Sequence, residues 1–390
     1  MCKNQRGLDD KSLDALVEKY GKDKLLESMT EEERAEFEKM YQRVLCSDNY
    51  RGLKYMLERG CPVDMEFREA YGGMKFEVGE YLKETRIATI TGSMTDPPFN
   101  PITPLAIVSI CSEMDKEPKL LKLLIEYGLD LRKCKKSEYG EVSRERYRGV
   151  KNASALYCAT VRCNTELVTM LLENGHPPED ELLYVLSTRR YLAHTPREKE
   201  ILSLLIKHGC DVNARKGENG NTLAHMALAL WFCYVEGLLK NCDDLDEGPF
   251  GGVQLTAKQW IFLNLEKMFL TNYIEFLGNH GFDFNGKNDR QQTLLHIFFK
   301  NVRMLKEIFP RPFLVVGHII KDLLPMIVDK VDDVNTVDSD GKTVLDEFIT
   351  GARKDLLVVY KPTNFEWLKT LIMKGACFSP IDYYDLIMIQ

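Results

Sequence analysis

The stretch "LLIKHGCDVNARKGENGNTLAHMAL", residues 204–228, joins the end of one predicted helix to the start of another. It opens with an apolar helix face that is closed by Gly209. Glycine adopts the left-handed conformation after a last helical turn without a Cβ penalty, so Gly209 predicts a helix end. Thr222 follows, and its hydroxyl is suited to accept a backbone N–H of a first helical turn. The stretch therefore predicts a helix end, a turn and a new helix.

Both halves of this stretch recur along the chain. The glycine-closed ending returns as "YMLERG" (55–60), "LLIEYG" (123–128), "MLLENG" (170–175), "FLGNHG" (276–281) and "TLIMKG" (370–375). The helix start returns as "TPLAIV" at 103, "SALYCA" at 154, "TLLHIF" at 293 and "TVLDEF" at 343. Gly175 and Gly209 lie 34 positions apart. Recurring helix pairs at this period indicate a repeat array in which each pair shields the next.

In its period and its motifs the chain resembles the ankyrin-repeat family. The best match is Gly209, Asp211, Val212 and Asn213, followed by Gly220, Thr222, His225 and Ala227. The resemblance implies an all-α repeat solenoid. It also implies that Thr222 bonds to His225, and Thr293 to His296, as fasteners between neighbouring repeats. Asparagine in this turn is a common target of hydroxylation in the family, which marks Asn213 as a modification site, with Asn335 as a weaker match.

The pattern divides the chain into three parts. We expect a helical N-terminal cap at 1–45, degenerate ankyrin repeats at 46–376 and a C-terminal cap at 377–390. About eight repeats are predicted, ending near Gly60, Gly128, Gly175, Gly209, Asn241, Gly281, Asp332 and Gly375. An insertion at 61–102 shows β-branched alternation and predicts a β-hairpin.

A second insertion, 131–153, is strongly basic. It holds eight Lys or Arg residues against three Glu, a local balance of +5 in a chain whose net charge is −7. Arginine grips carboxylate and phosphate in a two-point fashion, so the segment suits an acidic or phosphorylated partner, and nucleic acid less well. The alternative is a mobile, solvated loop.

The composition narrows the function classes. With 52 basic and 59 acidic residues there is no overall positive field to attract nucleic acid. No apolar run approaches the roughly 18 residues of a membrane helix. Eleven cysteines without CxxC pairs predict reduced thiols in the cytoplasm or nucleus. No phosphate-binding loop and no HExxH or paired CxxC zinc motif is present, so we expect no cofactor, no metal and no enzyme activity.

The leading hypothesis is therefore a scaffold or adaptor that binds a protein partner. The candidate contact residues are those of the insertions and turns: Arg144, Arg146, Tyr147, Arg148, Lys216, Glu218, Asn221, Arg290, Gln291 and Lys342. One alternative is a substrate-recognition adaptor of a ubiquitin ligase, or a pathogen effector acting in a host cell. Another is an enzyme with an unrecognised catalytic unit in 229–340, where the repeat matches are poorest.

Overall fold

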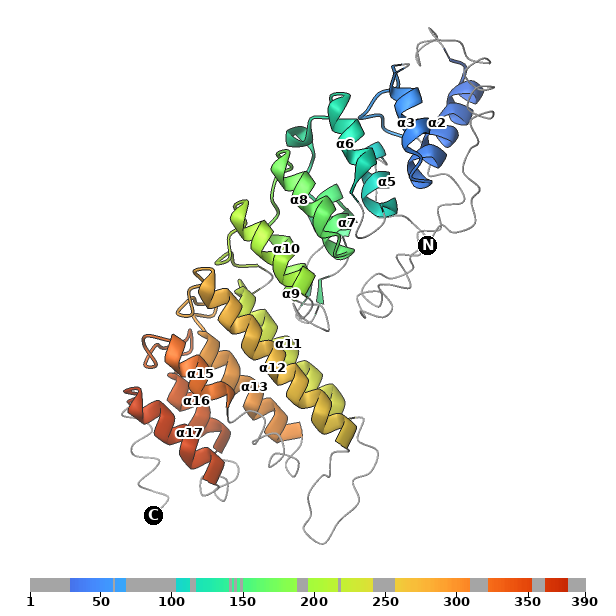
Figure 1. Cartoon of the computed structure of the whole chain (residues 1–390). Helices are drawn as coiled ribbons and strands as arrows, with labels where there is room; N and C mark the ends of the chain where they lie inside the picture. Colours follow the sequence, from blue (N-terminus) through green and yellow to red (C-terminus); the bar gives the residue numbers. More distant parts are fainter. Residues whose placement is uncertain are drawn as a thin grey trace, which may run out of the picture. The chain divides into compact units, whose positions relative to one another are not determined.

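The structure is a computed structural model. It describes residues 29–58, 60–67, 103–112, 117–139, 142–143, 146–147, 150–187, 196–216, 219–240, 257–308, 322–352 and 362–377. Its contacts divide the chain into two compact units (Figure 1). The first unit is Met1–Arg190 with Thr195–Cys210, and the second is Tyr191–His194 with Asp211–Gln390.

The first unit holds four antiparallel helix pairs. They are α2 (Glu31–Cys46) with α3 (Tyr50–Leu57), α5 (Pro104–Cys111) with α6 (Lys119–Glu126), α7 (Ala155–Val161) with α8 (Thr165–Glu173), and α9 (Glu181–Ser187) with α10 (Pro196–Lys207). The first helices α2, α5, α7 and α9 each contact the next one along the chain. Second helices contact one another as well, α3 with α6 and α8 with α10. The unit is thus two layers of helices with the core between them.

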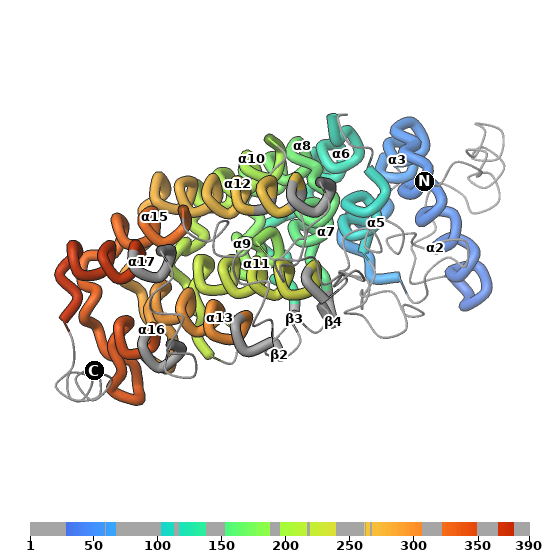
Figure 2. The backbone as a smooth tube through the Cα atoms, turned by 90° about the horizontal axis from the view of Figure 1, so that it is seen from below, coloured from blue at the N-terminus to red at the C-terminus, as the bar shows by residue number. Residues whose placement is uncertain are grey.

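The second unit holds three further pairs. They are α11 (Leu223–Lys240) with α12 (Ala257–Asn279), α13 (Leu294–Ile308) with α15 (Leu323–Lys330), and α16 (Val344–Ala352) with α17 (Pro362–Met373). Figure 2 shows α11, α13 and α16 in one row and α12, α15 and α17 in the other. Phe298, Phe299 and Trp367 meet edge to face between the rows, and all three are buried.

The predicted helix ends are confirmed. The six glycines at 60, 128, 175, 209, 281 and 375 all have positive φ, between 78° and 99°. At Gly209 the amide donates to the Ile206 carbonyl, while the Cys210 amide donates to the Leu205 carbonyl, both at 3.0 Å. These two bonds are the Schellman arrangement that closes a helix. The predicted starts are confirmed too, because the Thr103 and Ser154 side chains accept the amides of Ala106 and Tyr157.

Two predicted boundaries differ from the structure. Asn241 does not close a repeat, since it follows α11, which is only the first helix of a pair with α12. The apolar run "LALWFCYV" at 228–235 carries α11 well past the two turns of other first helices. The described residues hold seven pairs where the sequence predicts about eight. Likewise α2 pairs with α3, so a cap ending at residue 45 would cut through the first repeat.

The second insertion has a backbone fold that the sequence did not indicate. A short 3-10 turn (Leu131–Lys133) leads to β1 (Glu138–Tyr139), β2 (Val142–Ser143), β3 (Arg146–Tyr147) and β4 (Val150–Asn152). β1 pairs antiparallel with β4, and β2 with β3, so the segment is one hairpin rather than an unpaired loop. The hairpin predicted for 61–102 lies outside the described residues from 68 to 102, as does most of the C-terminal cap, from residue 378.

Candidate functional site

A buried carboxylate ties both ends of the second insertion to the next repeat. We call residues 131–153 the basic finger. Glu179, just before α9, is fully buried. One of its oxygens accepts the Ser137 amide at 3.1 Å, and the other accepts the Ser154 hydroxyl. The Ser154 amide donates to the Ser137 hydroxyl at 2.9 Å, which joins the two stems of the finger. Buried polar groups need such partners, so this clamp fixes where the finger leaves the array.

The titratable groups around the clamp are held neutral. Burial raises the pKa of the Cys158 thiol, and the Glu179 charge raises it further. Burial likewise lowers the pKa of His176, which donates from Nδ1 to the Pro177 carbonyl at 3.0 Å. A protonated buried thiol is a poor nucleophile, and this arrangement is structural rather than reactive.

Four cations at the start of the finger are exposed: Arg132, Lys133, Lys135 and Lys136. Asp130 pairs with Arg132 at 2.9 Å and with Lys133 at 3.9 Å. The hydrogen bond from Arg132 lowers the pKa of Asp130. Of the predicted finger residues, Arg146 and Tyr147 form strand β3, whereas Arg144 and Arg148 lie outside the described residues.

Histidines fasten the repeats of the second unit. The His225 Nδ1 accepts the Thr222 amide at 3.2 Å and lies 2.8 Å from the Thr222 hydroxyl. Thr293 and His296 repeat this geometry at 3.3 and 2.9 Å. Because each Nδ1 accepts a backbone N–H, the ring proton sits on Nε2, and the His296 Nε2 donates to the Lys342 carbonyl at 3.1 Å. The predicted Thr–His pairs are confirmed.

Burial keeps these histidines uncharged. It lowers the pKa of His225 to about 4, despite the nearby backbone of Thr293, and it lowers the pKa of His296 as well. In the last repeat Asp346 replaces histidine, and its carboxylate accepts the Thr343 amide at 2.6 Å. Neutral rings with these bonds serve as fasteners, not as catalytic bases or metal ligands.

Asparagines add a second tie between repeats. The Asn213 side-chain amide donates to the Gly281 carbonyl at 3.1 Å, and its oxygen accepts the Asp283 amide at 2.8 Å. Asn335 makes the same pair of bonds to Gly375 and Cys377, at 2.8 and 2.7 Å. Asn285, which sequence reading missed, bonds to Asp332 through both side-chain atoms. Hydroxylation of Asn213 stays a prediction.

Helix pairs closed by glycine, Thr–His fasteners and an asparagine ladder together define the architecture. The chain is an ankyrin-repeat array. In such an array the turns that precede the first helices are the natural place for binding residues, because helix layers bury the rest of each repeat.

Three such turns of the array line up in the second unit. We call residues 216–221, 288–292 and 338–342 the turn row. Lys216 and Asn221 form a β-bridge. The Asp289 amide donates to the Asn219 carbonyl at 2.8 Å, and the Ser339 amide donates to the Arg290 carbonyl at 2.9 Å. Arg215 forms an ion pair with Asp289. Backbone bonds therefore join each turn to the next.

The turn row collects most of the second-unit residues predicted as contacts: Lys216, Asn221, Arg290, Gln291 and Lys342. Glu218 lies outside the described residues. Gln291 is exposed and has φ 56°, whereas the equivalent positions hold Gly220 and Gly341. A left-handed conformation costs a non-glycine residue roughly 1–2 kcal/mol, so Gln291 is strained where its neighbours are not. Sequence reading missed Arg215 and Asp289, which pair across 74 positions.

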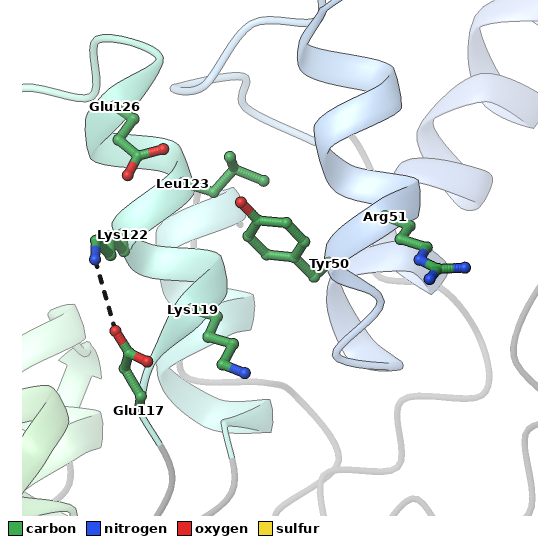
Figure 3. Close-up of a pocket in the computed structure, with 7 residues that line it drawn as sticks. All are labelled: Tyr50, Arg51, Glu117, Lys119, Lys122, Leu123 and Glu126. Carbon is green, nitrogen blue, oxygen red and sulfur yellow. Dashed lines mark ion pairs between the residues drawn. The ribbon is translucent and has the colours of Figure 1, made fainter.

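A hollow of about 420 Å³ lies between α3 and α6 in the first unit (Figure 3). Its lining residues are Tyr50, Arg51, Glu117, Lys119, Lys122, Leu123 and Glu126. Lys122 is 3.7 Å from Glu117, and Arg51 points away from both in Figure 3. Its charges are mixed and do not converge on one point, so the hollow has none of the preorganised polar groups of a reaction site.

Within the described ranges, no group of three or more His, Cys, Asp or Glu side chains is placed to hold a metal ion. In the same ranges, no helix is both long and apolar enough to span a membrane. Neither observation tests the segments that the structure does not describe.

Comparisons with known proteins add little to this picture. No family model and no curated protein matches the sequence. Among solved structures, the chain is similar to the crystal structure of the ankyrin repeat domain of Bcl-3, described there as a unique member of the IkappaB protein family. The identity is 14%, the match covers 80% of this chain and 97% of that one, and the TM-score is 0.41. A similarity this loose carries no argument, so the ankyrin assignment rests on the contacts described above.

Proposed function

We propose that the chain is a protein-binding scaffold whose basic finger holds an acidic or phosphorylated segment of a partner. The observation that supports this most is the clamp at Glu179. A carboxylate that is buried and bonded to both stems makes the finger a positioned element, and positioned cations lose less entropy on binding than those of a loose loop.

The charge of the finger sets the kind of partner. Lys135 and Lys136 are exposed beside Arg132 and Lys133, in a protein that is acidic overall. Cations gathered on one segment attract carboxylates and phosphates, and they raise association rates at low salt.

The turn row is the second contact region of the proposal. Its turns are joined by backbone bonds, so Arg290, Gln291 and Lys342 would meet a partner as a fixed set. Strain at an exposed residue such as Gln291 is a feature that clusters at binding sites.

We also propose that the chain is not itself an enzyme and works in the cytoplasm or nucleus. The described histidines of the repeat motif and the Ser154–Glu179 pair are engaged in ties between repeats. The nine described cysteines are free thiols, which supports a reducing compartment.

The test is charge reversal in the finger. Lys135→Glu and Lys136→Glu are combined with Arg146→Glu, and captured proteins are quantified by mass spectrometry after affinity purification from lysate. We expect acidic or phosphorylated partners to be lost at least tenfold, and phosphatase treatment to separate the two classes.

The matched control reverses exposed lysines far from the finger in sequence, Lys39→Glu with Lys369→Glu. It should retain the same partners. Equal capture by the finger variant and by wild type would remove the basic finger from the binding surface.

A further inference from the structure

The first two repeats bring two cysteine sulfurs into contact. Cys46 is the last residue of α2 and Cys111 the last residue of α5, and these helices pack side by side. The Cys111 side chain shares a hydrogen bond with that of Cys46. Cys46 is buried, while Cys111 is partly exposed to solvent. A thiol pair thus lies where the first helices of two consecutive repeats end.

The chemical setting of Cys111 differs from that of the other cysteines. Burial raises the pKa of Cys134 to about 11 and that of Cys210 to about 12, which keeps both thiols protonated. The pKa of Cys111 is lowered instead, first because of the hydrogen bond from Cys46 and further because of the Arg162 cation, against burial and the Asp48 charge. A thiolate that accepts a hydrogen bond beside a cation is the usual setting of a redox-sensitive cysteine.

We propose that Cys46 and Cys111 form a peroxide-sensitive pair that closes into a disulfide between the first two repeats. The Cys111 thiolate attacks one oxygen of a hydroperoxide. The O–O bond breaks, a sulfenic acid forms on Cys111, and the other oxygen leaves and takes up a proton. Cys46, as a thiolate, then attacks the Cys111 sulfur, the S–S bond forms, and the sulfenic oxygen leaves as water. The two thiols lose two electrons and the peroxide gains them.

The position of the pair determines what the disulfide would do. It would join the first two repeats at the ends of their first helices and close residues 47–110 into a covalent loop. A cross-link over so long a loop restricts the unfolded chain and stabilises the folded one. In a reducing compartment the bond would be transient, so the first repeats would be firmer during oxidation and return to their resting state afterwards.

The experiment uses the full chain, first fully reduced and then treated with an equimolar amount of hydrogen peroxide. Peptide mapping without reductant should find the Cys46 peptide linked to the Cys111 peptide as the main product, lighter by about 2 Da for the two hydrogens lost. The thermal midpoint of the first unit should rise by about 5 °C and return after addition of a dithiol.

Cysteine variants provide the controls. Cys111→Ser and Cys46→Ser should each abolish the link, whereas Cys377→Ser, at an exposed cysteine of the second unit, should leave it unchanged. If a variant does not fold, the map of the wild-type protein still decides. A main product that links any other pair, a Cys111 oxidised to sulfenic or sulfinic acid while Cys46 stays reduced, or no reaction at either residue would each overturn the proposal.

Discussion

The two units tie their repeats together with different chemistry at the same position. In the second unit a neutral histidine beside the helix-start threonine makes the tie, as Thr222 and His225 do. In the first unit Ala106 and Tyr157 occupy the histidine position, and at Ser154 a buried carboxylate from the following repeat takes over, Glu179. The imidazole only fastens. The carboxylate has two acceptor atoms and therefore also holds the basic finger, which shows how one repeat acquired a positioned insertion.

The largest expected effect breaks the carboxylate tie. Glu179→Ala leaves the Ser137 amide and the Ser154 hydroxyl without their acceptor, and we expect it to destabilise the first unit by about 4 kcal/mol. Denaturant unfolding measures the change. Glu173→Ala, at an exposed glutamate of α8, is the control and should cost less than about 0.5 kcal/mol. A loss below about 1 kcal/mol at Glu179 would mean that the clamp is not a tie.

The next effect separates the units by pH. The unfolded chain takes up a proton at His225 near pH 6.5, whereas the folded protein does so only near its lowered pKa of about 4. The unfolded state therefore binds more protons in this window, and stability is lost as the pH falls from 6.5 towards 4, by up to about 3 kcal/mol in the second unit.

Unfolding free energies measured at several pH values across this window check the effect. His225→Asn should flatten the profile at acidic pH, whereas His208→Asn, at the end of α10 in the first unit, is the matched control. An unchanged slope in His225→Asn would show that this fastener does not set the acid sensitivity.

A smaller effect probes the asparagine ladder of the second unit. Asn213→Ala removes two hydrogen bonds to the next repeat and should cost about 1.5 kcal/mol, because both are partly exposed to solvent. Asn174→Ala, whose side chain bonds only within its own helix end, should cost less. Thermal unfolding compares the two, and equal losses would argue against a ladder between repeats.

The smallest effect concerns the strained turn. Gln291→Gly should stabilise the second unit by about 0.5–1 kcal/mol, since glycine adopts positive φ freely. Gly341→Ala, at the equivalent position with φ 74°, should shift stability the opposite way by about 1 kcal/mol. The same Gln291 variant tests binding. If stability rises while partner capture falls, the strain is kept for recognition, whereas unchanged capture would remove Gln291 from the contact set.

Sequence reading succeeded where a signal is local and failed where it is not. Gly209 and Thr222 act on backbone within a few residues, so their roles could be predicted. Asn241 was misread as a repeat end, because periodicity alone does not say whether a helix stops after two turns or continues. Glu179 lies 25 positions beyond Ser154 in the acidic run "PPEDE", which reads as a solvated segment. The two prolines before it were the only hint of a constrained turn.

The order of helices, their glycine ends and the threonine–histidine pairs were determined by the sequence alone, because each depends on the conformational preferences of one residue and its immediate neighbours. Only the tertiary structure decided which carboxylate holds the finger, how the three turns connect and that the Cys46 and Cys111 sulfurs meet. Those contacts join residues of different repeats, and they exist only once stacked helices have removed the polar groups from water.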